Sequence, residues 1–193
     1  MASEPVSEPV AVPDPGQGPG PVADPVVFRA ALGRFPTGIT VVSAHVDGAD
    51  HAMTASAFAS VSLDPPLVLV CVAKDVRFYD AVRAAPGWGV SVLGEGSRAV
   101  SEWLALPGRP LVGQLDRIPF HRAGRSRAPL LDAALATLDC RTWAWYDGGD
   151  HDIVVGEVVD LALPRPDGRP LVHYRGDYHQ VGPRLPRKGH RLP

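Results

Sequence analysis

The sequence predicts a mainly β protein, built as an antiparallel barrel that is closed or nearly closed and carries a few short helices. Most of the chain after residue 38 consists of short β-branched or alternating segments, the pattern typical of strands. Turn signals such as Asp47-Gly48 give these segments connections of hairpin length. The strands do not alternate regularly with helices, which disfavours a parallel sheet built from βαβ units.

One domain is expected between two tails. Residues 1–23 hold six prolines and no aromatic residue, so they cannot bury enough apolar surface to offset the entropy of ordering. We therefore expect a disordered tail over 1–23, an ordered domain over 24–182 and a basic disordered tail over 183–193. A chain of 193 residues is long enough for one domain with a sizeable core.

The first ordered element is expected to be a short helix. Asp24 is a favoured N-cap, Pro25 suits the first helical position, and Gly33 is a suitable end. The period then changes to that of strands. We expect strands over 39–46 and 51–62 around the Asp47-Gly48 turn, and a fully buried strand over 67–73.

The second half of the chain continues the β pattern. We expect helices over 77–85 and 97–106, and strands over 88–93, 133–146, 152–163, 171–175 and 178–181. Residues 107–129 are rich in Gly, Pro and Arg, which predicts a long loop, and loops of that length in a domain are usually functional or mobile. Its Phe120 and His121 are candidates to cover a bound ligand.

Composition and motifs exclude several classes of protein. A net charge of −2 gives no electrostatic reason to expect nucleic acid or membrane binding. The longest apolar run, Leu67–Ala73, is too short to span a bilayer, and the N-terminus does not resemble a secretory signal. The sequence has no dinucleotide-binding glycine motif after a strand. Cys71 and Cys140 lie far apart with no metal-binding spacing, so we expect no metal and two reduced thiols in a cytoplasmic protein.

The segment Met53–Pro66 is the strongest candidate for chemistry. If it is one strand, a single face presents Thr54, Ser56, Phe58, Ser60 and Ser62. Hydroxyls can donate to sugar and phosphate oxygens, and small neighbours let the backbone approach a flat ring. Composition alone still favours an ordinary solvent-exposed strand over a binding surface.

Five segments together resemble the short-chain flavin reductase family. They are FRAALGRFPTGITVVSA (28–44), MTASAFASVSLDPPLVLVCV (53–72), PLLDAALATLDC (129–140), GDHDIVVGEV (149–158) and LVHYRGDYHQV (171–181). The resemblance covers about residues 26–182, and the blocks occur in the family's order and spacing.

The resemblance implies an FMN-binding split barrel, usually a homodimer with the flavin near the subunit interface. Family members oxidise NADH or NADPH and pass the hydride to FMN or FAD, and many supply reduced flavin to a separate monooxygenase. Hydride transfer needs no general base, so no catalytic residue is expected, and the barrel mainly positions the two rings.

The family's binding positions carry over to named residues. A flavin cradle is implied at Thr37, Thr54, Ala55, Ser56, Ala57, Ser60, Val61 and Ser62, with the flavin phosphate near Lys74, Asp75 and Arg77. Positions for the nicotinamide dinucleotide are implied at His151, Arg175 and Tyr178.

The chain departs from the family at the phosphate turn. Relatives usually carry Ser and Thr hydroxyls there, whereas this chain has Val76, Arg77 and Phe78. The change leaves two alternatives to a reductase open. One is a flavin-binding split barrel with an oxidase or non-redox biosynthetic activity, and the other is a non-enzymatic barrel that binds a different small ligand.

Overall fold

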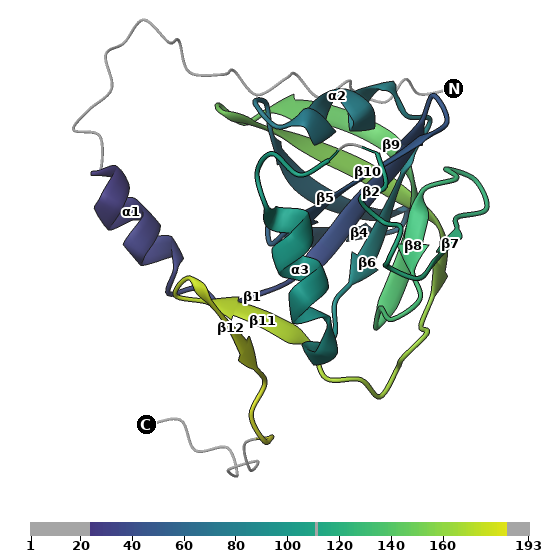
Figure 1. Cartoon of the computed structure of the whole chain (residues 1–193). Helices are drawn as coiled ribbons and strands as arrows, with labels where there is room; N and C mark the ends of the chain where they lie inside the picture. The colour runs from purple at the N-terminus through teal and green to yellow at the C-terminus, as the bar shows by residue number, and fades with distance from the viewer. Residues whose placement is uncertain (1–23, 111, 185–193) are drawn as a thin grey trace, which may run out of the picture.

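The computed structural model describes residues 24–110 and 112–184 and confirms the mainly β prediction (Figure 1). The tail predicted over 1–23, and all but two residues of the one predicted over 183–193, lie outside the described residues. No helix in the described part of the chain has the length and apolar character needed to cross a membrane.

The described residues form three sheets and three short α-helices. The helices are α1 (Pro25–Leu32), α2 (Arg77–Ala84) and α3 (Arg98–Ala105), the last preceded by a 3₁₀ turn, Glu95–Ser97. The seven-stranded sheet has the order β3 (Ala49–Ala55), β2 (Thr40–Val46), β6 (Trp88–Val92), β9 (Ala136–Asp147), β10 (His151–Ala162), β5 (Pro66–Ala73) and β4 (Phe58–Leu63). A three-stranded sheet joins β1 (Thr37–Gly38), β11 (Leu171–Tyr174) and β12 (Asp177–Gln180), and β7 (Phe120–Arg122) pairs with β8 (Pro129–Leu131).

The barrel closes where the chain passes from β3 to β4. These consecutive strands are the two edges of the seven-stranded sheet, so Ser56 and Ala57 cross from one edge to the other. The Cys71 amide of β5 donates a hydrogen bond of 3.0 Å to the Ala57 carbonyl at this crossing. The prediction of one strand over 51–62 is therefore wrong, because the chain exchanges its partner β2 for β5 within that segment.

The predicted stripe of hydroxyls is lost with that strand. Besides the crossing at Ser56, an irregularity in the pairing of β4 with β5 lies between Ser60 and Ser62 and shifts the alternation again. Phe58 packs against the buried core rather than joining a polar face. The five side chains from Thr54 to Ser62 therefore do not form one continuous surface.

Strand β2 organises the core because its two faces are buried in different clusters. Val42 packs in the cluster around Trp88, and Val41 packs in a second cluster with Leu104 of α3. Strand β5 is less buried than predicted. Its side chains alternate between buried, at 68, 70 and 72, and half-buried, so it is not a fully buried strand.

The segment 107–129 contains more structure than the predicted loop. It includes β7, whose Phe120 packs against the second core cluster. His121 Nδ1 lies 2.8 Å from a carboxylate oxygen of Asp132 on the exposed side of this hairpin. Neither of these side chains lines the pocket described below.

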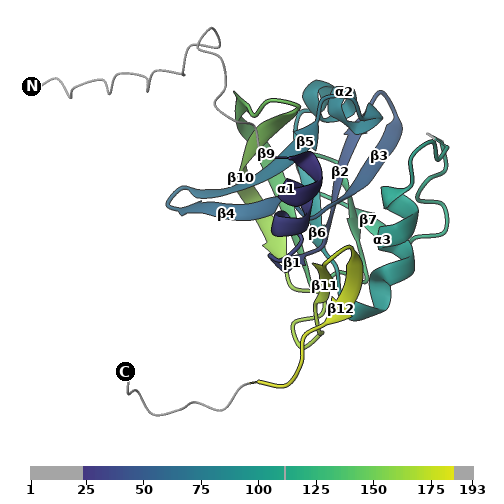
Figure 2. The ribbon, with the colours of Figure 1, turned by 90° about the vertical axis from the view of Figure 1, so that its left-hand side faces the viewer.

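Helix α1 begins as predicted and then lies apart from the barrel. The Asp24 carboxylate accepts from the amides of Val26 and Val27 at 2.7 and 3.2 Å. No residue of α1 is buried, and Figure 1 shows the helix to one side of the barrel. Figure 2 shows the β4–β5 hairpin also projecting outward. Large apolar side chains are exposed on these two elements and the turn after α1: Val26, Val27, Phe28, Leu32, Phe35, Val61 and Leu63.

Candidate active site

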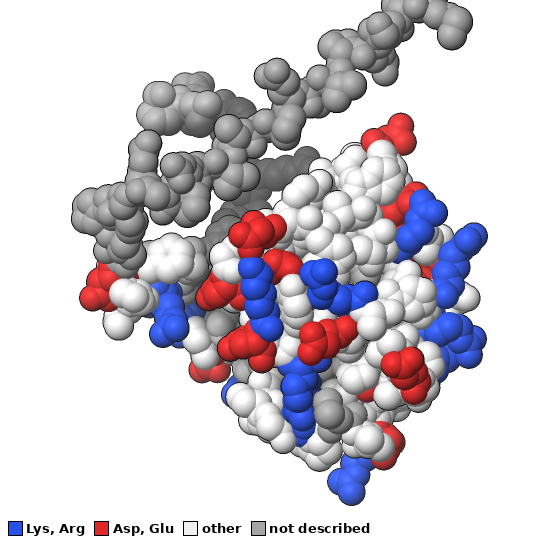
Figure 3. All heavy atoms as spheres, turned by 90° about the horizontal axis from the view of Figure 1, so that it is seen from above, with Lys and Arg blue, Asp and Glu red and all other residues white. Residues whose placement is uncertain are grey.

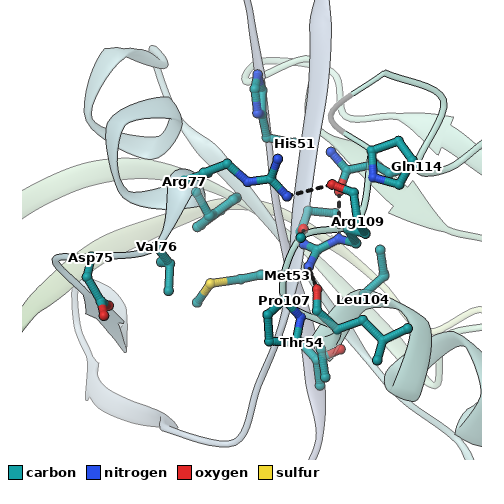
Figure 4. Close-up of a pocket in the computed structure, with 16 residues that line it drawn as sticks. His51, Met53, Thr54, Asp75, Val76, Arg77, Leu104, Pro107, Arg109 and Gln114 are labelled. Atoms are coloured by element: carbon teal, nitrogen blue, oxygen red, sulfur yellow. Dashed lines mark hydrogen bonds between the residues drawn. The ribbon is translucent and has the colours of Figure 1, made fainter.

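A pocket of about 460 Å³ lies between β3, the start of α2 and the segment that follows α3 (Figure 4). Residues 51–54 of β3 form its floor, residues 75–78 form one wall, and residues 104–110 with Gln114 form the other. Its volume is within the range of about 300–1,000 Å³ that small-molecule sites occupy.

Three of the predicted site residues meet in this pocket: Thr54, Asp75 and Arg77. The Thr54 hydroxyl donates a hydrogen bond of 2.7 Å to the carbonyl of Ser101 in α3. Its proton is therefore already used, and the hydroxyl can only accept from a ligand. Figure 4 shows Asp75 and Arg77 pointing in different directions from the start of α2, so the carboxylate does not neutralise the guanidinium.

Two guanidinium groups give one part of the pocket a positive charge. Arg77 donates a hydrogen bond of 2.5 Å to the carbonyl of Arg109. Arg109 donates in turn to the carbonyl of Leu106 at 3.0 Å and to the side-chain oxygen of Gln114 at 3.2 Å. Within residues 24–110 and 112–184, neither arginine forms an ion pair with a carboxylate.

The electrostatics of this part of the pocket favour an anion. Burial, and then the neighbouring Arg77 cation, lower the pKa of the Arg109 guanidinium. Burial also lowers the pKa of His51 on the pocket floor, which favours the neutral imidazole. A phosphate group would supply the negative charge that the two arginines do not find in the protein.

The first turn of α2 adds backbone donors to the same wall. Its N-cap residue is Val76, which makes no side-chain capping hydrogen bond. The first amides of a helix attract anions because most of them have no partner within the helix. In this turn the Tyr79 amide already donates to the Val76 carbonyl at 2.9 Å, so the available donors are those before it. Phe78 is 5% exposed and belongs to the core. Its aromatic side chain therefore has a packing role at a turn where relatives usually carry hydroxyl residues. Apolar walls and a cationic end together fit a flavin that carries a phosphate.

Lys74 is turned away from the pocket. Its ammonium bonds to the Asp147 carboxylate and lies 3.4 Å from that of Asp152, and the hydrogen bond to Asp147 raises the pKa of Lys74. Figure 3 shows the acidic and basic side chains interspersed on the face that carries α2. The structure therefore does not bring Lys74 together with Arg77 as a second free cation.

His151 lies beside Lys74, at the start of β10. Its Nδ1 is 2.7 Å from a carboxylate oxygen of Asp150, and its side chain is 44% exposed. The Asp150 carbonyl accepts a hydrogen bond of 3.0 Å from the Lys74 amide. The His151 side chain is accessible and oriented, but it does not line the pocket.

The remaining predicted residues are distributed around the barrel. Ala55 is buried at the end of β3, Ser56 and Ala57 are exposed at the crossing, and Ser60, Val61 and Ser62 lie on β4. Thr37 lies on β1, and its hydroxyl is buried without a hydrogen-bond partner among the described residues. Arg175 is exposed at the β11–β12 turn, with a φ of 55°.

Tyr178 is connected to the pocket floor through α3. Its hydroxyl lies 3.0 Å from the Ser101 hydroxyl, and the backbone carbonyl of Ser101 accepts from Thr54. Tyr178 packs against the second core cluster and does not line the pocket. Ser101 of α3 therefore links Tyr178 of β12 to Thr54 of β3.

Sequence reasoning missed several residues that line the pocket: His51, Met53, Leu104, Arg109 and Gln114. Arg109 stands between Gly108 and Pro110 in a segment without periodicity, and such a segment does not predict where a side chain points. Its only signal is that it is a cation in a long loop.

A comparison with protein families gives one match over most of the described chain. The flavin reductase like domain matches residues 32–182. The chain belongs to the flavin reductase family.

Relatives of this family member include a flavin reductase and the reductase component of a monooxygenase. It is 42% identical over 146 residues to the NADH-dependent FAD reductase of Streptomyces globisporus, covering 73% of this chain and 79% of the relative. It is also 42% identical over 154 residues to the reductase component of 4-hydroxyphenylacetate 3-monooxygenase from Thermus thermophilus, covering 80% of this chain and 95% of the relative.

Solved structures of flavin reductases share the fold of this family member. One is BorF, the flavin reductase component of a bacterial two-component tryptophan halogenase. It matches with a TM-score of 0.78 and 38% identity, over 83% of this chain and 100% of that one. The split-barrel architecture implied by the resemblance is confirmed.

Proposed function

We propose that this protein is an NADH-dependent flavin reductase that transfers a hydride to FMN or FAD and supplies reduced flavin to a separate monooxygenase. The observation that carries the proposal is the pocket, which combines apolar walls with two arginines that have no carboxylate partner in the described part of the chain. The relatives named as NADH-dependent reductases and as monooxygenase components support the same activity.

In this proposal the protein supplies binding and orientation. The flavin, when bound, provides the hydride acceptor. Arg77 and the start of α2 hold the phosphate, Thr54 and the crossing at Ser56 and Ala57 line the ring and its side chain, and the walls exclude water. The other predicted positions, at Thr37, Ala55, Ser60, Val61, Ser62 and Asp75, extend this cradle, whereas Lys74 stays in its ion pairs outside the pocket. His151, Arg175 and Tyr178 position the nicotinamide dinucleotide.

A homodimer is part of the proposal. Soluble monomers rarely leave a large contiguous apolar surface exposed. Here α1, the turn after it and the β4–β5 hairpin present Phe28, Phe35 and Leu63 respectively to solvent. A second copy would cover these elements and bring apolar surface against β4, where part of the predicted cradle lies.

We also place the protein in the cytoplasm, because both cysteines are free thiols and the proposed reductant is a cellular dinucleotide.

The experiment is to follow NADH absorbance with purified full-length protein, alone and after addition of FMN or FAD. A reductase oxidises NADH only when flavin is present, and NADPH in a parallel assay tests the choice of nicotinamide. Flavin binding without NADH oxidation would support the alternative of a different flavin-dependent activity. No binding of either flavin would reject the proposal.

A further inference from the structure

The wall of the pocket formed by the start of α2 offers backbone amides but few side-chain donors for a phosphate. Val76 and Phe78 bring only apolar side chains to it, and Lys74, one turn earlier, is already paired with carboxylates. Arg77 is therefore the single side-chain cation that α2 offers to the pocket. A second one comes from the opposite wall, 32 residues later in the chain.

We propose that Arg109 is a phosphate-binding residue of this site, acting with Arg77 on the phosphate of the bound flavin, and that Gln114 is its positioning residue. The inference rests on the proposed function and adds a group that lies outside the expected phosphate turn.

Arg109 is held in place on three sides. Its Nε donates to Gln114, one Nη donates to the Leu106 carbonyl, and the other Nη donates to the Ala52 carbonyl of β3. A guanidinium has five N–H donors, so one N–H on each Nη remains for a ligand. Gln114 is itself fixed by a 2.9 Å hydrogen bond to the Asp50 carbonyl. A group with so little freedom loses little entropy when it binds an anion.

The charge balance points to a phosphate. The Arg77 guanidinium donates to the backbone carbonyl of Arg109, and its charge, after burial, lowers the pKa of the Arg109 guanidinium. No carboxylate among the described residues pairs with either arginine. A phosphate monoester carries about −1.5 to −2 charges at neutral pH, which matches the two cations. A carboxylate would balance only one of them. Figure 4 shows both arginine side chains directed to the same part of the pocket from opposite walls.

The test compares ligands that differ by the phosphate. Riboflavin, FMN and FAD are titrated calorimetrically into the full-length protein and into Arg109→Gln. We expect Arg109→Gln to weaken FMN and FAD binding about tenfold or more, the equivalent of one charge-assisted hydrogen bond, and to leave riboflavin affinity unchanged. Equal losses for all three ligands would overturn the proposal, because they would indicate a general distortion of the pocket.

A matched control comes from the same segment. Arg117→Gln removes the same charge, but Arg117 lines a neighbouring apolar groove and not this pocket, so it should leave all three affinities unchanged. If Arg109→Gln does not fold, Gln114→Glu keeps Arg109 in place and sets a carboxylate against it. The same selective loss of FMN and FAD is then expected, and an unchanged ratio of FMN to riboflavin affinity would overturn the proposal.

Steady-state kinetics separates the flavin phosphate from the diphosphate of NADH. A rise in KM for NADH in Arg109→Gln, with unchanged FMN and FAD affinity, would assign Arg109 to the nicotinamide dinucleotide and overturn the proposal. The failure of the proposed function is distinct from both results, because the unaltered protein would then either bind no flavin or bind it without oxidising NADH.

Discussion

The hydroxyl of Tyr79 in α2 donates a hydrogen bond of 2.7 Å to the carboxylate of Asp152 in β10. This bond, followed by the bond to Lys74 and the charge of Arg83, lowers the pKa of Asp152 below its usual 3.8. The contact fastens α2 to the barrel beside the wall of the pocket. A carboxylate whose pKa is lowered by folding stabilises the folded state above its unfolded pKa, and that contribution is lost as pH falls through the folded value.

The first prediction concerns this loss of stability at low pH. Tyr79→Phe removes the main hydrogen bond, so the pKa of Asp152 should rise toward 3.8 and the acid-labile part of the stability should shrink. Urea unfolding measured from pH 6 down to pH 2 should show a smaller decrease in the free energy of unfolding for Tyr79→Phe than for the unaltered protein. Parallel curves for the two proteins would show that the bond does not contribute in this way.

The second prediction concerns the barrel core. A Cβ added at Gly156 of β10 would lie 2.5 Å from Cζ2 of the fully buried Trp88. Overpacking of this kind typically costs about 1–3 kcal/mol, so Gly156→Ala should lower the free energy of unfolding by that amount. Gly124→Ala is the control, because an added Cβ there meets no atom within 4 Å, and its stability should change little. Equal stability of the two variants would contradict the prediction.

The third prediction tests the proposed dimer. Val26 is 73% exposed on α1, and Val26→Glu should disrupt an interface that covers this helix. A glutamate in the first turn favours the helix itself, so dissociation would not result from loss of α1. We expect analytical ultracentrifugation to show a dimer for the unaltered protein and a shift to monomer for Val26→Glu.

Val112→Glu is the matched control for that experiment. Val112 is 87% exposed and lies after α3, away from α1 and the β4–β5 hairpin. It should leave the oligomeric state unchanged. A monomeric unaltered protein, or a dimer that tolerates Val26→Glu, would contradict the proposed interface.

The fourth prediction concerns His151. If this accessible, oriented imidazole positions the nicotinamide, His151→Ala should lower kcat/KM for NADH about ten- to a hundredfold, the effect of losing a contact worth roughly 1–3 kcal/mol. Flavin affinity should stay nearly constant. Steady-state kinetics with NADH would return unaltered parameters if His151 contacts only Asp150 in its own turn.

Local signals explain which elements the sequence predicts well. Asp24 caps α1 as expected, and Asp47 and Gly48 adopt φ values of 50° and 75°, as a tight hairpin turn requires. The break at Ser56 and Ala57 has no such local signal, because alternating small residues continue through it without a proline or an extra glycine. It is fixed by the exchange of β2 for β5 as pairing partner, which depends on residues far away in the chain.

The candidate site was predictable to a similar extent. Thr54, Asp75 and Arg77 follow from the family motifs, and all three line the pocket. Arg109 does not follow from them, since the path of the segment after α3 depends on its contacts with β3 through Ala52 and Gln114. The family motifs also indicate Lys74, but it does not line the pocket, because its carboxylate partners come from the distant β9–β10 hairpin.

Because the start of α2 has no side-chain cap, we expect a phosphorylated flavin bound there to stabilise the folded protein and to slow its degradation. With Val76 as N-cap, the amides of the first turn lack a partner from the side chain that normally provides one. An anion bound there would complete the helix, and it would bind the folded chain but not the unfolded one. Ligand at a hundred times its Kd adds about 2.7 kcal/mol of stability by mass action. We therefore expect cells short of phosphorylated flavin to hold more unfolded chain and to degrade it faster, so that the amount of enzyme follows the amount of flavin.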